Sequence, residues 1–215
     1  MITLSVCFRA IAAFAIAALL SAPAQAQQAG FIDEARFGIA WINPEFIEKD
    51  HPELDQFGLN AEVLFTPFDF DFRADPTDGF VRELLTPRFH LGTTVNLDED
   101  GTSTFYGGLT WHHALGERFF VETSLGLSAN NGEIDGKYEG LETYVAPSGR
   151  LRTRPKLSRA RLGSNVTFRE SLSIGYNVTE SMNVMLSIAH NSHSRIFDDK
   201  NRGLTNIALK TGFKF

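Results

Sequence analysis

The stretch VTFRESLSIGYNVTESMNVMLSIAHNS, residues 166–192, decides the fold. From Val166 to Tyr176, every second side chain except Glu170 is apolar, and polar or small residues fill the positions between. The second half of the stretch repeats this pattern. An alternation of period two is typical of β-strands whose two faces meet different surroundings. The short polar segment 177–181 predicts a tight turn, so the stretch is expected to form a β-hairpin.

The same alternation recurs along the rest of the chain. One face of each segment is apolar and aromatic, while the other carries Arg, Glu, His, Lys, Asn and Gly. Each segment has roughly the length of a membrane-crossing strand. The eight segments are 35–42, 58–65, 86–97, 103–112, 118–128, 164–176, 182–192 and 204–215.

The N-terminus predicts export. Arg9 lies in an apolar stretch that ends in Ala24-Gln25-Ala26, a pattern typical of a cleaved secretory signal peptide over residues 1–26. The only cysteine, Cys7, lies inside this peptide, so the mature single domain, 27–215, is expected to contain no disulfide. The net charge of −6 argues against a nucleic-acid partner.

An exported chain of this pattern, ending in an apolar strand with Phe215, favours an all-β fold. We expect an eight-stranded, antiparallel, up-and-down transmembrane β-barrel of the outer-membrane type, with the apolar face on lipid. Such a barrel is just wide enough for side chains, which argues against an open transport channel. A soluble β-sandwich is the other alternative. The polar face is then a buried network of Arg36, Glu62, Arg88, His90, Glu122, Arg169, Lys210 and Lys214.

Loop lengths orient this barrel. With both termini in the periplasm, the periplasmic turns are 71–85, 113–117 and 177–181, and the external loops are 45–56, 98–102, 129–163 and 193–203. The longest external loop is basic, and it is either simply solvated or attracted to lipopolysaccharide phosphates. Its basic residues are Arg150, Arg152, Arg154, Lys156, Arg159 and Arg161.

Three polar residues interrupt the apolar face near one end of the barrel. His190 and Ser192 continue the row of Val184 and Ile188, so they are expected to point toward lipid near the outer end of their strand. An ionisable side chain on a lipid-facing surface indicates a function. A tight turn at 177–181 brings Glu170 opposite residue 188 or 190. A carboxylate, an imidazole and a hydroxyl then form the arrangement of an acyl-transfer hydrolase. The alternative is an interfacial histidine beside an unrelated serine.

The final hairpin, HNSHSRIFDDKNRGLTNIALKTGFKF, resembles the lipid A 3-O-deacylases of the PagL type, in the acyloxyacyl hydrolase group. That family carries H-x-S-N before a loop with N-x-G. The resemblance identifies His190 as the general base and Ser192 as the nucleophile, with Asn201 and Gly203 as the N-x-G motif that binds substrate or oxyanion. It implies a bacterial outer-membrane enzyme that acts on lipid A, or lipopolysaccharide, among outer-membrane lipids, without cofactor or metal.

The chain departs from the family at two positions. His193 stands where the family has Asn, and Thr205 and Asn206 stand where the family has the glutamate that orients the histidine. Either Glu170 supplies the carboxylate from the other neighbouring strand, Thr205 orients the imidazole, or activity is lost. We favour Glu170.

The sequence therefore predicts an outer-membrane serine esterase that remodels lipopolysaccharide. The alternative function is a non-catalytic barrel, an adhesin or structural protein, that binds through its external loops. The sequence does not decide whether the barrel is a monomer or a homodimer.

Overall fold

The computed structural model describes residues 31–44, 46–47, 54–67, 84–134, 141–145, 149–155, 159–193 and 203–215. The expected signal peptide, 1–26, most of the turn 71–85, and Asn201 lie outside these ranges. In the part of the chain that is described, no helix is both long enough and apolar enough to cross a membrane.

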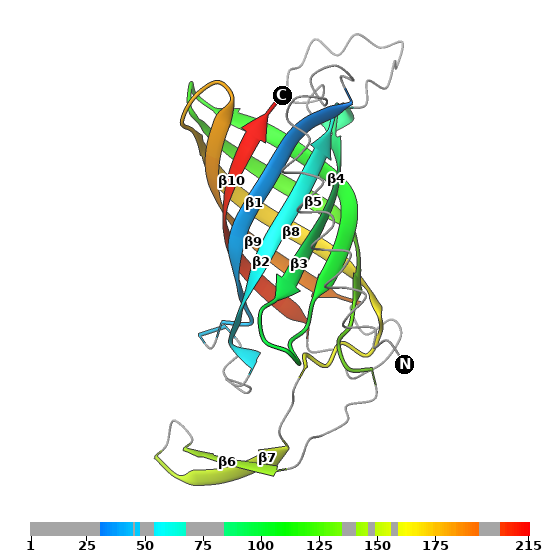
Figure 1. Ribbon diagram of the computed structural model, residues 1–215, viewed down its shortest axis with the longest axis vertical. Helices are drawn as coiled ribbons and strands as arrows, with labels where there is room; N and C mark the ends of the chain where they lie inside the picture. The colour runs from blue at the N-terminus through cyan, green and yellow to red at the C-terminus, as the bar shows by residue number, and fades with distance from the viewer. Residues whose placement is uncertain are drawn as a thin grey trace.

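The chain forms a closed barrel of eight strands in which every neighbouring pair is antiparallel (Figure 1). The predicted all-β, eight-stranded fold is confirmed, and the soluble β-sandwich is excluded. The order around the barrel is β1-β10-β9-β8-β5-β4-β3-β2. The barrel strands are β1 (Ile32–Ile42), β2 (Gln56–Phe65), β3 (Arg88–Asn96), β4 (Thr104–Leu115), β5 (Phe119–Asn130), β8 (Val166–Asn177), β9 (Met182–Ser192) and β10 (Leu204–Lys214).

The barrel closes where its first strand meets its last. β1 pairs with β10 from Glu34 opposite Lys214 to Ile42 opposite Asn206. Closure leaves no strand edge with unpaired backbone groups, which is the condition for a sheet to cross lipid. Two connections at one end, 116–118 and 178–181, are short, as is typical of periplasmic turns. The long loop between β5 and β8 lies at the opposite end, which is therefore the cell-surface end.

The outer wall is apolar. Leucine, isoleucine and phenylalanine side chains of the barrel strands remain exposed, and among them are Ile39, Leu59, Leu125, Leu172, Leu186 and Leu209. Aromatic pairs lie near both ends of the wall, with Phe31 against Phe65 at the turn end and Trp41 against Phe57 at the loop end. Such girdles mark the two interfaces of a membrane.

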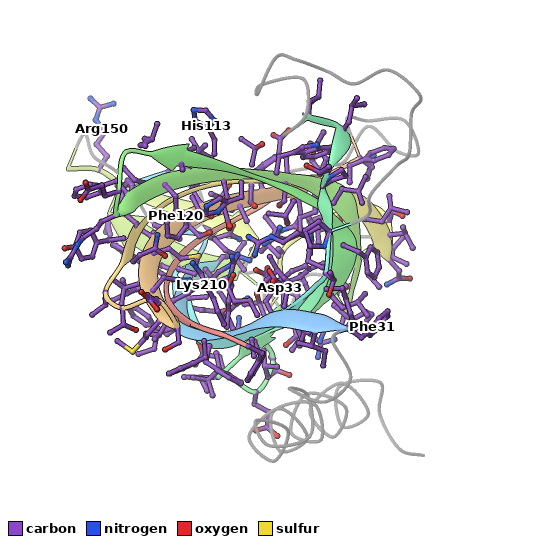
Figure 2. All side chains as sticks on the ribbon, turned by 90° about the horizontal axis from the view of Figure 1, so that it is seen from above. Phe31, Asp33, His113, Phe120, Arg150 and Lys210 are labelled. Carbon is purple, nitrogen blue, oxygen red and sulfur yellow. The ribbon has the colours of Figure 1, made fainter. Side chains whose placement is uncertain are left out.

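Charged side chains fill the barrel interior at its periplasmic half. Arg36, 2% exposed, donates to Glu34 at 2.8 Å, to Glu62 at 3.2 Å and to Glu122 at 2.7 Å. Arg88 donates to Glu34 at 3.0 Å and also pairs with Glu122. Viewed along the barrel, Figure 2 shows the side chain of Lys210 inside the wall. The predicted interior network is present, and it fills space that a transport channel would need.

Three members of the predicted network differ in detail. His90 is buried but bonds to Thr110 Oγ1 at 2.8 Å, and Arg169 stacks on the ring of Tyr106 at 3.9 Å. Lys214 lies outside the network, because it is close to the periplasmic end and donates to Asn177 Oδ1 at 2.9 Å. Lys214 is the last residue of β10 and therefore lies at the rim of the barrel, a position that the alternation of the sequence does not reveal.

The long external loop contains a second, two-stranded sheet that the sequence did not predict. β6 (Leu141–Val145) pairs with β7 (Leu151–Pro155), and Figure 1 shows this hairpin beyond the loop end of the barrel. Of the basic cluster, Arg150 is exposed before β7, while Arg159 turns back to the carbonyl oxygen of Asp100 at 3.0 Å. The cluster is therefore distributed along the loop.

Candidate functional site on the outer wall

His190 and Ser192 lie on the outward face of β9. Asn183, Met185, Ser187, Ala189 and Asn191 are all buried inside the barrel, and the residues between them are at least partly exposed. His190 and Ser192 belong to this second set. The predicted outward direction of the pair is confirmed. The same alternation makes Glu170 an exposed residue of β8.

The strand pairing places His190 between two candidate partners. Glu170 on β8 is directly opposite His190, one of the two registers predicted from the short turn. Thr205 on β10 is directly opposite His190 on the other side. Cα atoms of directly opposite residues in antiparallel strands are about 4.5–5.5 Å apart, so both side chains are within reach of the imidazole. The site therefore spans three neighbouring strands.

The imidazole makes its hydrogen bond with the threonine. His190 Nδ1 lies 2.9 Å from Thr205 Oγ1. Within the described residues, no hydrogen bond or ion pair joins His190 to Glu170 or to Ser192. Catalytic hydrogen bonds are often long in an enzyme without substrate and tighten when the substrate binds. The hydrogen bond with Thr205 therefore orients the imidazole of His190 with Nδ1 toward β10.

A threonine holds the ring less selectively than a carboxylate. A carboxylate can only accept, so it requires the proton on Nδ1 and leaves Nε2 free as a base. A hydroxyl can accept from Nδ1–H or donate to a bare Nδ1, so both tautomers of His190 satisfy Thr205. The bond therefore orients the imidazole but selects its basic tautomer weakly.

Asn43 fixes the backbone of Thr205, a role that the sequence did not predict. The Thr205 N–H donates to Asn43 Oδ1 at 2.9 Å, and the Asn43 N–H donates to the Thr205 carbonyl at 2.7 Å. Asn43 is buried and has a φ of 47°, a left-handed conformation that asparagine tolerates better than most residues. The residue follows β1 directly, so the end of the first strand anchors the start of the last.

Gly203 packs against the histidine ring. Its φ is 76°, and a Cβ at this position would lie 2.5 Å from His190 Cε1 and 2.9 Å from Nε2. Only glycine combines this backbone conformation with so close an approach. Gly203, of the predicted N-x-G motif, therefore lies close to Cε1 and Nε2 of the imidazole. Asn201 lies outside the described residues, and His193, at the family's asparagine position, is buried.

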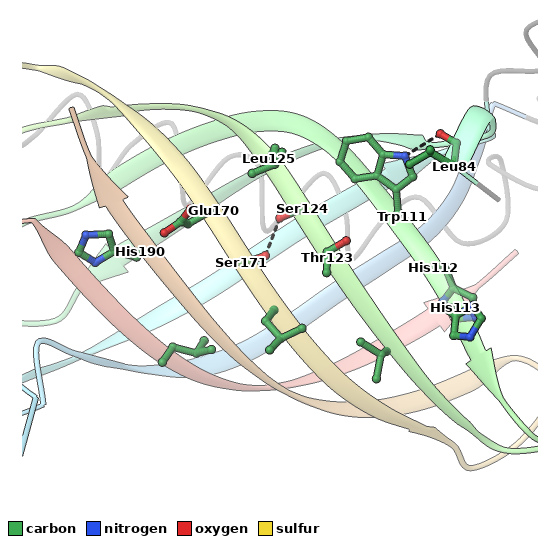
Figure 3. Close-up of a pocket in the computed structure, with 13 residues that line it drawn as sticks. Leu84, Trp111, His112, His113, Thr123, Ser124, Leu125, Glu170, Ser171 and His190 are labelled. Carbon is green, nitrogen blue, oxygen red and sulfur yellow. Dashed lines mark hydrogen bonds between the residues drawn. The ribbon is translucent and has the colours of Figure 1, made fainter. Parts of the chain in front are cut away.

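Two grooves in the outer wall meet at His190. One, of about 480 Å³, is lined in part by Ser192, Phe168 and Leu127. The other, of about 930 Å³, extends across the wall toward β4 (Figure 3). Leu125, Glu170 and His190 line both. The polar site therefore opens onto a largely apolar surface that faces the membrane.

Comparisons with known proteins agree with the barrel fold. A family model described as "Lipid A 3-O-deacylase (PagL)" matches residues 88–214, more than half of the chain. The crystal structure of the outer membrane enzyme PagL is 13% identical, with a TM-score of 0.52, covering 85% of this chain and 99% of that one. No curated protein matches the sequence.

Other small barrels are less similar. The N-terminal β-barrel domain of Pseudomonas aeruginosa OprF is 11% identical, with a TM-score of 0.46, covering 86% of this chain and 99% of that one. Neisserial surface protein A is also 11% identical, with a TM-score of 0.44, covering 87% of this chain and 98% of that one.

Proposed function

Because the chain belongs to the lipid A 3-O-deacylase (PagL) family of the bacterial outer membrane, we propose that it hydrolyses an acyl ester of lipid A, with Ser192 as the nucleophile and His190 as the general base. The observation that carries this proposal is the lipid-facing histidine, held by Thr205 and Gly203 two residues from a serine of the same face. The substrate is itself a lipid of the outer leaflet, so its ester reaches such a site without leaving the membrane.

The first half of the reaction is acyl transfer to the enzyme. His190 Nε2 takes the proton from Ser192 Oγ while Oγ bonds to the ester carbonyl carbon. The loop that carries Asn201 and Gly203 holds the oxygen that becomes negative. The bond from the carbonyl carbon to the lipid A oxygen then breaks, and His190 returns its proton to that oxygen. Deacylated lipid A leaves as an alcohol.

The second half restores the serine. Water replaces lipid A, gives a proton to His190 and attacks the acyl carbon. The bond between Ser192 Oγ and the acyl carbon then breaks, His190 returns its proton to Oγ, and the fatty acid leaves. Both halves create a protonated imidazole. Thr205 orients the ring through Nδ1, and Glu170, directly across on the other flank, stabilises the positive charge through its carboxylate.

The test compares lipid A from cells that make the wild-type chain with lipid A from cells that make Ser192→Ala. We expect mass spectrometry to show the loss of one acyl chain with the wild type and intact lipid A with the variant. Ser187→Ala is the matched control, because Ser187 lies on the same strand but inside the barrel, and it should deacylate normally.

Two outcomes would contradict the proposal. Intact lipid A with a folded wild-type barrel would favour the non-catalytic alternative. Deacylation by Ser192→Ala would be consistent with an esterase activity but would show that Ser192 is not its nucleophile.

A further inference from the structure

The larger of the two grooves has a direction. It begins at His190 and Glu170, passes Ile188, Leu172 and Leu125, and reaches Trp111 (Figure 3). These residues come from β9, β8, β5 and β4, four consecutive strands of the wall. The groove therefore runs obliquely across the strands, away from the surface end and toward the periplasmic end of β4, where Trp111 lies four residues before the last residue of the strand.

A short side chain creates the hollow. Thr123 is exposed on the outer wall, with Trp111 directly opposite on β4 and Leu172 directly opposite on β8. Val121 and Leu125 are its same-face neighbours along β5. Because Trp111, Leu172 and Leu125 are larger and Val121 is of similar size, Thr123 forms a low point beside apolar walls on three sides.

The far end of the groove is fixed by a hydrogen bond. Trp111 Nε1 donates to the carbonyl oxygen of Leu84 at 2.9 Å, and both residues line the groove. A bonded indole has little rotational freedom, and an indole N–H in an apolar surrounding needs such a partner. Trp111 therefore forms a rigid wall at the β4 end of the groove, where His112 and His113 are the other lining residues of that strand.

The length of the groove suits an alkyl chain. Ser192 and Trp111 are separated by three strand spacings of about 4.8 Å across the sheet and by four residues of about 3.3 Å along the strand. These two distances are perpendicular, so the diagonal path is about 20 Å long. A zigzag chain with C–C bonds of about 1.5 Å advances about 1.3 Å per carbon, so about 15 carbons fill the path.

We propose that this groove binds the acyl chain that is cleaved and that Trp111 sets its maximum length. The inference rests on the proposed function and deepens it. The occupant is an acyl chain because most of the exposed lining is apolar, although His113 and Thr123 also contribute to it, and because Glu170 and His190 join the groove to Ser192. A sugar headgroup would leave its hydroxyl groups without partners there.

The first test uses kinetics on a series of glucosamine esters that differ only in acyl length, with purified barrel in detergent micelles. Thr123→Phe fills the low point, so kcat/KM should fall about tenfold for long chains and little for short ones. Trp111→Ala removes the rigid wall, so the preferred length should increase. Thr211→Phe is the matched control, an outward threonine on β10 that lines neither groove, and its profile should match the wild type.

The second test detects binding without turnover. The chain has two tryptophans, so Trp41→Phe leaves Trp111 as the only tryptophan, which can be excited selectively over the tyrosines. In this background, Ser192→Ala should bind a brominated acyl glucosamine in unbrominated micelles. Bromine at the end of the chain should quench Trp111 strongly, and bromine beside the ester should quench it weakly.

The outcomes separate the groove from the reaction. If Thr123→Phe and Trp111→Ala both hydrolyse the esters with an unchanged preference for acyl length, the groove does not bind the cleaved chain, although the proposed esterase activity still holds. Position-dependent quenching without wild-type hydrolysis would support the groove and contradict the esterase. Quenching that is equal for both bromine positions, or that brominated bulk detergent reproduces, means that ordinary membrane lipid occupies the groove, which overturns the inference.

Discussion

At the scale of single residues, His190 is held by a neutral partner in a position where its family uses a carboxylate. Thr205 supplies geometry through one hydrogen bond of 2.9 Å, and Glu170 supplies charge from the opposite strand. A carboxylate in the family position combines both functions in one side chain. Dividing them between two strands predicts a slower enzyme in which each partner contributes separately.

Thr205→Val removes the hydrogen bond while keeping the shape of the side chain. We expect kcat to fall about tenfold with KM nearly unchanged, far less than the ~10⁴-fold loss that follows removal of a triad carboxylate. Thr205→Ser is the control and should keep most of the rate. Steady-state kinetics on a lipid A ester measures both variants, and a Thr205→Val rate equal to wild type would remove Thr205 from the mechanism.

Glu170→Gln tests the contribution of charge. The substitution keeps the size of the side chain but removes the charge opposite His190, so kcat should fall about tenfold because the protonated imidazole is less stable. Glu180→Gln, in the exposed turn at the other end of the barrel, should change nothing. If both glutamine variants behave alike in the same assay, Glu170 has only a surface role.

At the scale of elements, the strands were predictable where alternation alone determines them. The segment 182–192 coincides with β9. On its outward face Val184, Leu186 and Ile188 are apolar, and most residues of its inward face are small or polar. β1 begins before its predicted start because an irregularity between Ile32 and Glu34 interrupts the alternation. β6 and β7 have five residues each, and such short runs become strands only through their pairing with each other.

The candidate site was predictable where local sequence patterns determine the position of a residue. Parity and turn length alone place Glu170 opposite Ile188 or His190, and the family motif identifies Gly203. Asn43 could not be found in this way, because it lies 162 positions from Thr205 and contacts it only when the barrel closes. Trp111 and Thr123 have the pattern of ordinary strand residues, and only the strand register brings them beside the site.

Asn43→Ala tests the anchor between β1 and β10. It leaves the Thr205 N–H without its acceptor, which costs about 1–3 kcal/mol for a buried group, and it adds strain at a positive φ. We expect lower stability toward urea and a lower kcat. Asn43→Gly is the control for strain, since glycine accepts this φ but offers no acceptor. If Asn43→Gly equals wild type in both measurements, the hydrogen bond is unimportant.

At the scale of the whole molecule, the barrel has its polar groups inside and its apolar groups outside. The interior charges are mutually paired, with Arg36 in contact with three glutamates. Removing one member of such a buried set is costly because its partners remain charged and lose their counter-ion. The candidate site, by contrast, lies on the outer surface and contributes little to this balance, so stability and the proposed activity should respond to different substitutions.

Arg36→Met should lower the free energy of unfolding by about 3–5 kcal/mol, since three carboxylates lose their shared cation. Adding Glu122→Gln should recover part of the loss, because one unpaired charge is removed. Urea titration in lipid vesicles measures both. A double variant as unstable as the sum of its single variants would show that the two side chains act independently.

The pairing of β1 with β10 links the proposed catalytic site to the closure of the barrel. Asn43 can hold Thr205, and through it the ring of His190, only after the first and last strands have met. A chain whose sheet is still open has the reactive residues but not their alignment. In the proposed enzyme, ester hydrolysis therefore requires a closed barrel, and the rate at which activity develops should report how fast barrels become complete in the membrane.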